Sequence, residues 1–245
     1  MTDVEVPRQS RRSIRWGLVA TVLWSAALLG GFDLVGGLLI KVLARFARSG
    51  LASAQVHAML TDDVTLRLAA TSLVMLLGCA CVIAIIRLKK GASLREYLAL
   101  RRVRIGVLLR WIGALLLFLV VEAILFGILG KRDKLFVDNL FSSVPMWLSL
   151  ATVLVIAPLF EELTFRGFIF AGLESSIVRT WGAIVITAGL WAFFHPQYTA
   201  FGVAVVFALG LLFGVARFRS GSLIVPLALH SLHNLSAFGL YTLGR

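Results

Sequence analysis

The chain has 245 residues, of which 60% are hydrophobic and 15% are charged, and its mean hydropathy is +0.96. A soluble domain needs a far more charged surface, so the composition excludes a soluble globular protein and indicates an integral membrane protein. The formal net charge of +12 does not predict a nucleic-acid partner, because the basic residues gather at the ends of apolar segments, as is typical of membrane proteins.

Seven apolar segments approach the ~20 residues that an α-helix needs to cross a bilayer. They lie at residues 16–43, 66–86, 105–129, 144–173, 181–194, 199–218 and 223–243. Four glycines around Asp33 predict a bend in the first segment. Residues 93–102 are too short and too charged to span, and they predict an amphipathic helix at the membrane interface. The expected fold is therefore all-α: a polytopic transmembrane bundle of about seven spans plus an interfacial helix.

The distribution of basic residues predicts the orientation of this bundle. The loop at residues 87–104 carries seven Lys or Arg residues, and the N-terminal 15 residues carry four. The loop around Asp62 and Asp63 is acidic instead. The pattern predicts a cytoplasmic N-terminus and a C-terminus on the other side, although the basic residues at 131–134 fall on the opposite face.

Two adjacent carboxylates and a guanidinium interrupt the fourth apolar segment, as Glu161, Glu162 and Arg166. Each ionisable group at membrane depth costs roughly 2.5 to 3.5 kcal/mol, so their presence indicates a use. In a helix, Glu162 and Arg166 lie one turn apart and can pair, which leaves Glu161 freer to act on another group. A structural ion pair that locks two helices together is the alternative.

Further polar residues occur near the end of the chain. His195 ends the fifth segment, and the seventh segment holds His230, His233 and Asn234, with His230 and Asn234 four residues apart on one face. With a rise of ~1.5 Å per residue, Glu161, His195, His230 and Asn234 all lie about 12–21 Å from the expected cytoplasmic ends of their segments. We therefore expect these side chains to be able to meet.

The residue types limit the chemistry of such a cluster. The sequence has no Gly-x-Ser-x-Gly, no His-Glu-x-x-His and no plausible cysteine nucleophile. A carboxylate beside a histidine can activate water as a general base, and a second histidine with an asparagine can donate to an oxyanion. Glu161, His195 and His230 could instead bind Zn²⁺, and the sequence does not separate the two possibilities, although we favour water activation without metal.

Three motifs in this order resemble those of the CPBP (CAAX protease and bacteriocin-processing, or Abi) family, which includes the type II CAAX prenyl proteases. The matching residues are Glu161, Glu162 and Arg166 for Glu-Glu-x-x-x-Arg, Trp191 and His195 for Phe-x-x-x-His, and His230 and Asn234 for His-x-x-x-Asn. Trp191 replaces the usual phenylalanine. The resemblance covers about residues 144–238, and it divides the chain into N-terminal membrane helices (1–143) and a catalytic helical core (144–240).

The resemblance implies an intramembrane endopeptidase and assigns its catalytic residues. Glu161 and His195 would activate water, and His230 and Asn234 would form the oxyanion hole. Glu162 and Arg166 complete the motif, and participation of a metal stays open in the family. The implied substrate is a peptide or protein at the bilayer, with no nucleic acid, and the implied location is a bacterial cytoplasmic membrane.

Two other readings of the same residues are open. A member of the family could keep the site and work as a non-proteolytic membrane scaffold or immunity protein. A proton-coupled transporter could use Glu122, Glu161 and His195 as a relay, but the sequence has no internal repeat and no matching pair of broken helices, which are typical of transporters.

Overall fold

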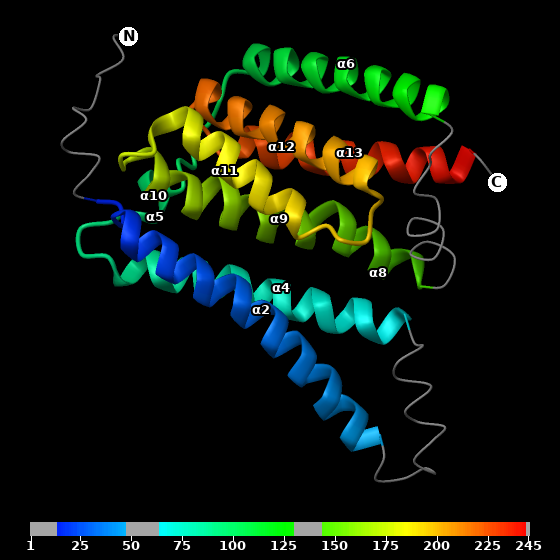
Figure 1. The fold of residues 1–245 in the computed structure, drawn as a ribbon, viewed down its shortest axis with the longest axis horizontal. Coiled ribbons are helices and arrows are strands. Elements are labelled where there is room, and N and C mark those ends of the chain that lie inside the picture. The colour runs from blue at the N-terminus through cyan, green and yellow to red at the C-terminus, as the bar shows by residue number, and fades with distance from the viewer. Residues whose placement is uncertain (1–13, 48–63, 130–143, 244–245) are drawn as a thin grey trace.

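The computed structural model describes residues 14–47, 64–129 and 144–243, and every regular element among them is helical (Figure 1). The helices that stand apart are α2 (Leu18–Ala47), α4 (Val64–Leu88), α5 (Leu94–Tyr97), α6 (Ile105–Leu129), α11 (Arg179–Phe193), α12 (Ala200–Ser220) and α13 (Ile224–Leu243). Between α6 and α11 lies one long helical run made of α8 (Met146–Ala151), η1 (Thr152–Ile156), α9 (Ala157–Glu161), η2 (Glu162–Ile169) and α10 (Phe170–Glu174). The all-α fold expected from the sequence is confirmed.

Within the described residues, five helices are long and apolar enough to cross a membrane. They are α2, α4, α6, the run Met146–Glu174 and α12. The count of seven spans is not confirmed. The fifth expected span is α11, which has only 15 residues, and the seventh is α13, whose middle carries two histidines and an asparagine. Both run alongside the long helices, in alternating directions (Figure 1).

Residues 93–102 do not form the expected interfacial helix. Only one turn, α5, is helical, and its last residue, Tyr97, and the next two, Leu98 and Ala99, are buried. The Tyr97 ring stacks on Phe168 with centroids 5.9 Å apart, and Ala99 adopts a left-handed φ of 49° that stops the helix. The prediction was wrong because tertiary packing draws this segment into the bundle.

The glycines around Asp33 do not interrupt the first span, because α2 is a continuous helix from Leu18 to Ala47. A Cβ atom added at Gly30, Gly31, Gly36 or Gly37 would meet nothing within 4 Å. None of these four glycines is therefore required for a close contact with another described helix.

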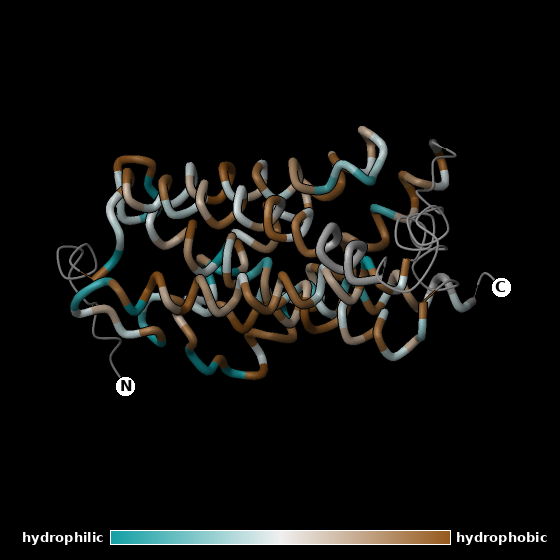
Figure 2. The backbone as a smooth tube through the Cα atoms, turned by 90° about the horizontal axis from the view of Figure 1, so that it is seen from below, coloured by the Kyte–Doolittle hydropathy of each residue, from teal (hydrophilic) through white to brown (hydrophobic). Residues whose placement is uncertain are grey.

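One end of the bundle is closed by contacts between loops, and we call it the basic end because exposed Lys and Arg residues gather there. The indole N–H of Trp16, before α2, donates to Ile85 O near the end of α4 over 3.1 Å. Ser222, between α12 and α13, donates to Arg101 O over 2.6 Å. Hydrophilic residues lie mainly at the helix ends, whereas the helices themselves are largely hydrophobic (Figure 2).

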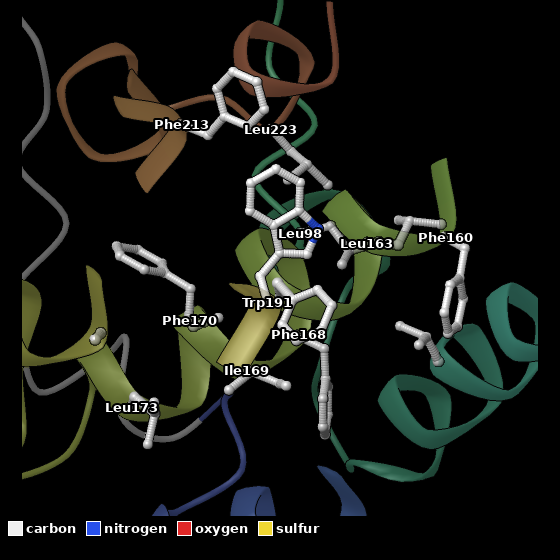
Figure 3. Packing of buried hydrophobic residues seen from close by; sticks show 14 of the residues in the cluster. Leu98, Phe160, Leu163, Phe168, Ile169, Phe170, Leu173, Trp191, Phe213 and Leu223 are labelled. Atoms are coloured by element: carbon white, nitrogen blue, oxygen red, sulfur yellow. The ribbon is translucent and has the colours of Figure 1, made fainter. Parts of the chain in front are cut away.

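The core lies around η2, where aromatic and aliphatic side chains from several helices meet (Figure 3). Phe168 and Phe170 are fully buried there, and Phe213 of α12 and Trp191 of α11 pack with them. Helices α11 and α12 approach closely because Gly210 faces Ala188; a Cβ at Gly210 would lie 3.0 Å from Ala188 Cβ and 3.1 Å from its Cα. Small residues at a helix contact are typical of membrane proteins.

We expect Gly210→Ala to lower the free energy of unfolding by about 1–3 kcal/mol, because overpacking forces α11 and α12 apart. Thermal unfolding of the purified protein in detergent measures the loss. Gly113→Ala is the matched control, since a Cβ at Gly113 in α6 meets nothing within 4 Å. An equal loss in the two variants would contradict the close approach.

Candidate active site

The helix that carries the two adjacent carboxylates is not a regular α-helix. Two π-helical segments interrupt it, η1 at Thr152–Ile156 and η2 at Glu162–Ile169. Single π-helical turns inside α-helices occur frequently at functional sites. Glu161 ends α9 and lines a cavity, whereas Glu162 begins η2 and is fully buried.

Glu162 and Arg166 form an ion pair in the interior of the bundle. Arg166 Nη1 donates to Glu162 Oε1 over 3.1 Å, and both side chains are 0–1% exposed. Arg166 Nη2 donates to Gly210 O of α12 over 3.2 Å, and the guanidinium lies 4.5 Å from the centroid of the Trp191 ring. Removing one partner of such a buried pair leaves an uncompensated charge, so the two residues depend on each other.

His230 lies between the two carboxylates. Its Nδ1 is 3.0 Å from Glu162 Oε1, and its Nε2 is 3.9 Å from Glu161 Oε2. Because an ionised carboxylate only accepts hydrogen bonds, Nδ1 carries the hydrogen in the bond to Glu162. The Arg166–Glu162 pair therefore fixes the ring of His230, and Nε2 points toward Glu161.

Glu161 is held by a second side chain. The Trp191 indole Nε1–H donates to Glu161 Oε2. The Trp191 ring also lies edge-on to His230, with centroids 5.3 Å apart. Trp191 therefore orients Glu161 and also packs against His230.

His195 is oriented by the backbone. Its Nδ1 lies 2.7 Å from Trp191 O, and because a carbonyl accepts, Nδ1 carries the hydrogen. The His195 ring stacks on Tyr198, with centroids 5.9 Å apart and an interplanar angle of 5°. This tautomer leaves Nε2 as a proton acceptor. In the described structure no direct hydrogen bond joins His195 to Glu161.

Asn234 already makes a hydrogen bond, because its Nδ2 donates to Val153 O over 2.8 Å. In η1, Thr152 O accepts from Ala157 N–H, five residues on. The next carbonyl, that of Val153, would need the N–H of residue 158, which is a proline and has none. Asn234 replaces that missing donor, and one of its two amide hydrogens is left for another partner.

These side chains meet at a cavity of about 520 Å³ between α4, the Met146–Glu174 run, α11, α12 and α13. Its charged and polar lining includes Arg67, Glu161, Trp191, His195, Gln197, Tyr198, His230, His233 and Asn234. Of the six predicted site residues, Glu161, His195, His230 and Asn234 line the cavity, while Glu162 and Arg166 lie behind it and support His230.

Two features of this site were not predicted from the sequence. The first is the hydrogen bond from Trp191 to Glu161, whose only sequence signal is a tryptophan in place of phenylalanine. The second is the contact of His233 Nε2 with Glu122 Oε2 at 3.4 Å, which joins α13 to α6. Glu122 thus contacts a cavity residue but lies outside the cavity lining described above.

The donor set does not fit a bound metal. Among the described residues, no group of three or more His, Cys, Asp and Glu side chains is arranged to hold a metal ion. Glu161, His195 and His230, which the sequence offers for Zn²⁺, do not converge into one coordination sphere. We therefore assign no catalytic step to a metal.

Comparison with known proteins finds a match for the C-terminal part of the chain. Residues 143–236 match the family model of Rce1-like type II CAAX prenyl endopeptidases. This match supports the assignment of the region to the CAAX protease (CPBP) family. Over 100 residues the chain is 40% identical to an uncharacterised 24.3 kDa protein of Escherichia coli, a match that covers 40% of this chain and 45% of that protein. No solved structure matches the chain significantly.

The match confirms the resemblance drawn from the three motifs, and at the level of the family it points to a CAAX-type membrane protease. The family and the five long apolar helices together indicate an integral membrane protein. The chain matches less than half of the length of the Escherichia coli relative, whose name assigns no activity.

We expect Glu162→Gln to destabilise the protein strongly, by about 3–5 kcal/mol, because it leaves the buried Arg166 charge uncompensated. Thermal unfolding in detergent is the measurement. Glu161→Gln is the matched control, since Glu161 makes no ion pair with Arg166 and should unfold close to wild type. If Glu162→Gln unfolds like wild type, the buried ion pair does not hold the site together.

Proposed function

We propose that this protein is an intramembrane endopeptidase that hydrolyses peptide bonds at or within the membrane, with water activated by Glu161 and His195. The observation that carries the proposal is the cavity itself. The carboxylate of Glu161 and the imidazole of His195, whose Nε2 can accept a proton, line the cavity. Two further side chains with N–H groups, His230 and Asn234, line it from α13. The family match to type II CAAX prenyl endopeptidases supports the same reaction class.

The first step is the attack of water on the substrate carbonyl carbon. Trp191 holds one oxygen of Glu161, which fixes the carboxylate, and the backbone fixes His195 with its Nε2 available. A water molecule bound by the two groups loses a proton to Glu161 as its oxygen forms the new C–O bond. The proton then passes to the leaving nitrogen when the C–N bond breaks. No covalent intermediate with the enzyme is required.

The tetrahedral intermediate carries a negative oxygen, which His230 and Asn234 would stabilise. Asn234 has one amide hydrogen beyond the one given to Val153 O. His230 gives its Nδ1 hydrogen to Glu162, so donation from Nε2 requires a ring that carries both protons. The flanking carboxylates of Glu161 and Glu162 are suited to balance that positive charge. Donors aimed at a developing oxyanion act mainly in the transition state.

The substrate in this proposal is a peptide or protein segment at the bilayer. A cavity that lies among membrane-spanning helices supports such a substrate. The resemblance of residues 143–236 to prenyl endopeptidases does not by itself require a prenyl group. We also propose the bacterial cytoplasmic membrane as the location, which the Escherichia coli relative supports.

Glu161→Gln should abolish cleavage while insertion and yield stay near wild type, because it removes the base without removing bulk. Purified protein in detergent, incubated with a labelled peptide library, tests this. The matched control is Glu96→Gln, which alters an exposed carboxylate in α5 and should cleave like wild type. Cleavage by Glu161→Gln within a few-fold of wild type would end the water-activation assignment.

Asn234→Ala should lower both kcat and the free energy of unfolding. Loss of an oxyanion donor lowers kcat by roughly 10²- to 10³-fold with little change in KM. The unpaired Val153 carbonyl lowers the free energy of unfolding by about 1–3 kcal/mol. Steady-state kinetics and thermal unfolding on this variant separate the two effects.

Ser231→Ala is the control for Asn234→Ala, because Ser231 lies on the same helix and bonds only Leu227 O within it. It should leave both quantities near wild type. A destabilised Asn234→Ala with near-normal kcat would limit Asn234 to its structural bond with Val153.

A further inference from the structure

Helix α6 presents one carboxylate to the rest of the bundle. Only 6% of its apolar 18-residue stretch is buried, against 24–44% in the other four long helices. The face that it turns to the bundle includes Leu115, Phe118, Glu122 and Phe126, at spacings of three and four residues. Glu122 is the one acidic residue of α6. Because an ionisable group at membrane depth is costly, its place on an otherwise apolar face indicates a use.

Two side-chain contacts on successive turns of this face join α6 to its neighbours. Glu122 Oε2 lies 3.4 Å from His233 Nε2 on α13. One turn further, the ring of Phe126 meets that of Phe201 on α12 edge-on, with centroids 5.1 Å apart. An aromatic contact of this kind attaches a helix without any polar group. Attachment of α6 therefore does not by itself require a carboxylate.

The contact of Glu122 resembles the one that holds His230. Both histidines line the cavity from α13, and each ring meets a carboxylate that stands behind the lining. Glu162 lies 3.0 Å from His230 Nδ1, and Glu122 lies 3.4 Å from His233 Nε2. An ionised Glu122 only accepts hydrogen bonds, so Nε2 of His233 carries the hydrogen and its Nδ1 is left as an acceptor.

A peptide in this cavity needs such an acceptor. The cavity walls are largely apolar, with Leu68 and Val206 among them, so the backbone N–H groups of an extended chain lose their water there. In the proposed mechanism, Glu161 and His195 are engaged with the attacking water. His233 offers an acceptor that this mechanism does not use, within one helical turn of the oxyanion donors on α13.

We propose that His233 binds a backbone N–H of the substrate peptide beside the scissile bond, and that Glu122 is a positioning residue that fixes the His233 ring. The identity of the ligand rests on the proposed function, whereas the hold of Glu122 on the ring does not. Neither residue belongs to the three motifs, and Glu122 lies outside residues 143–236, which match the family model. Helix α6 thereby contributes to a site that it does not line.

Kinetics on the library peptide that the purified enzyme cleaves best tests the binding role. Glu122→Leu and His233→Leu should each raise KM by about 3- to 10-fold, the effect of one hydrogen bond, and kcat should change little. The double variant should have the KM of His233→Leu alone, because Glu122 acts through that ring. An unchanged KM in His233→Leu, or additive effects in the double variant, would overturn the proposal.

Two variants separate positioning from attachment of the helix. Glu122→Gln keeps an oxygen that accepts from His233 Nε2, so its KM should stay within about two-fold of wild type. Phe126→Leu is the matched control on the same face of α6, and it should lower the melting temperature while KM stays at the wild-type value. If Phe126→Leu raises KM as much as Glu122→Leu does, Glu122 only attaches α6 and the proposal fails.

The ring itself can be observed by NMR without any need for activity. The chain has four histidines, and in protein with isotopically labelled histidine the His233 signal is the one that His233→Leu removes. Its Nε2–H hydrogen should exchange with solvent several-fold more slowly in wild type and Glu122→Gln than in Glu122→Leu. Equal exchange in all three would overturn the positioning role. If wild type cleaves no library peptide, the proposed function fails, while the exchange rates still decide whether Glu122 holds the ring.

Discussion

The buried ion pair of Arg166 and Glu162 is the interaction on which the rest of the site depends. Each ion is costly to bury alone, and the two compensate each other inside η2. From this pair, Arg166 reaches Gly210 O on α12 and the ring of Trp191 on α11, while Glu162 fixes His230 on α13. One pair thus connects four of the five helical elements that line the cavity. The pair can therefore lock helices together and also orient His230, so the two roles that the sequence offers as alternatives are compatible.

Irregular backbone supplies the second constraint. The π-helical turn η1 and Pro158 leave the Val153 carbonyl without a helical partner, and Asn234 satisfies it from the neighbouring helix. In a bilayer an unsatisfied carbonyl is expensive, so the irregular turn and the asparagine require each other. The same bond places the Asn234 amide at the cavity wall. A local distortion in one helix thereby positions a polar group of another.

The sequence predicted what depends on local pattern. The hydropathy pattern predicted the bounds of α6, and the i, i+4 spacing predicted the ion pair of Glu162 and Arg166. It could not predict that residues 93–102 would be drawn into the core, because the contact of Tyr97 with Phe168 is tertiary. The hydrogen bond from Trp191 to Glu161 could not be predicted from the sequence either, since it depends on how closely α11 packs on the helix that carries Glu161.

In the proposed mechanism water, and no side chain, attacks the peptide bond. Cleavage of a labelled peptide by the purified protein in the presence of hydroxylamine tests this directly, because an acyl-enzyme would transfer its acyl group to the added nucleophile. We predict products that carry only a free carboxylate at the new C-terminus, at a rate that hydroxylamine does not change. Hydroxamate that accumulates with the added nucleophile would show a covalent intermediate and contradict the account.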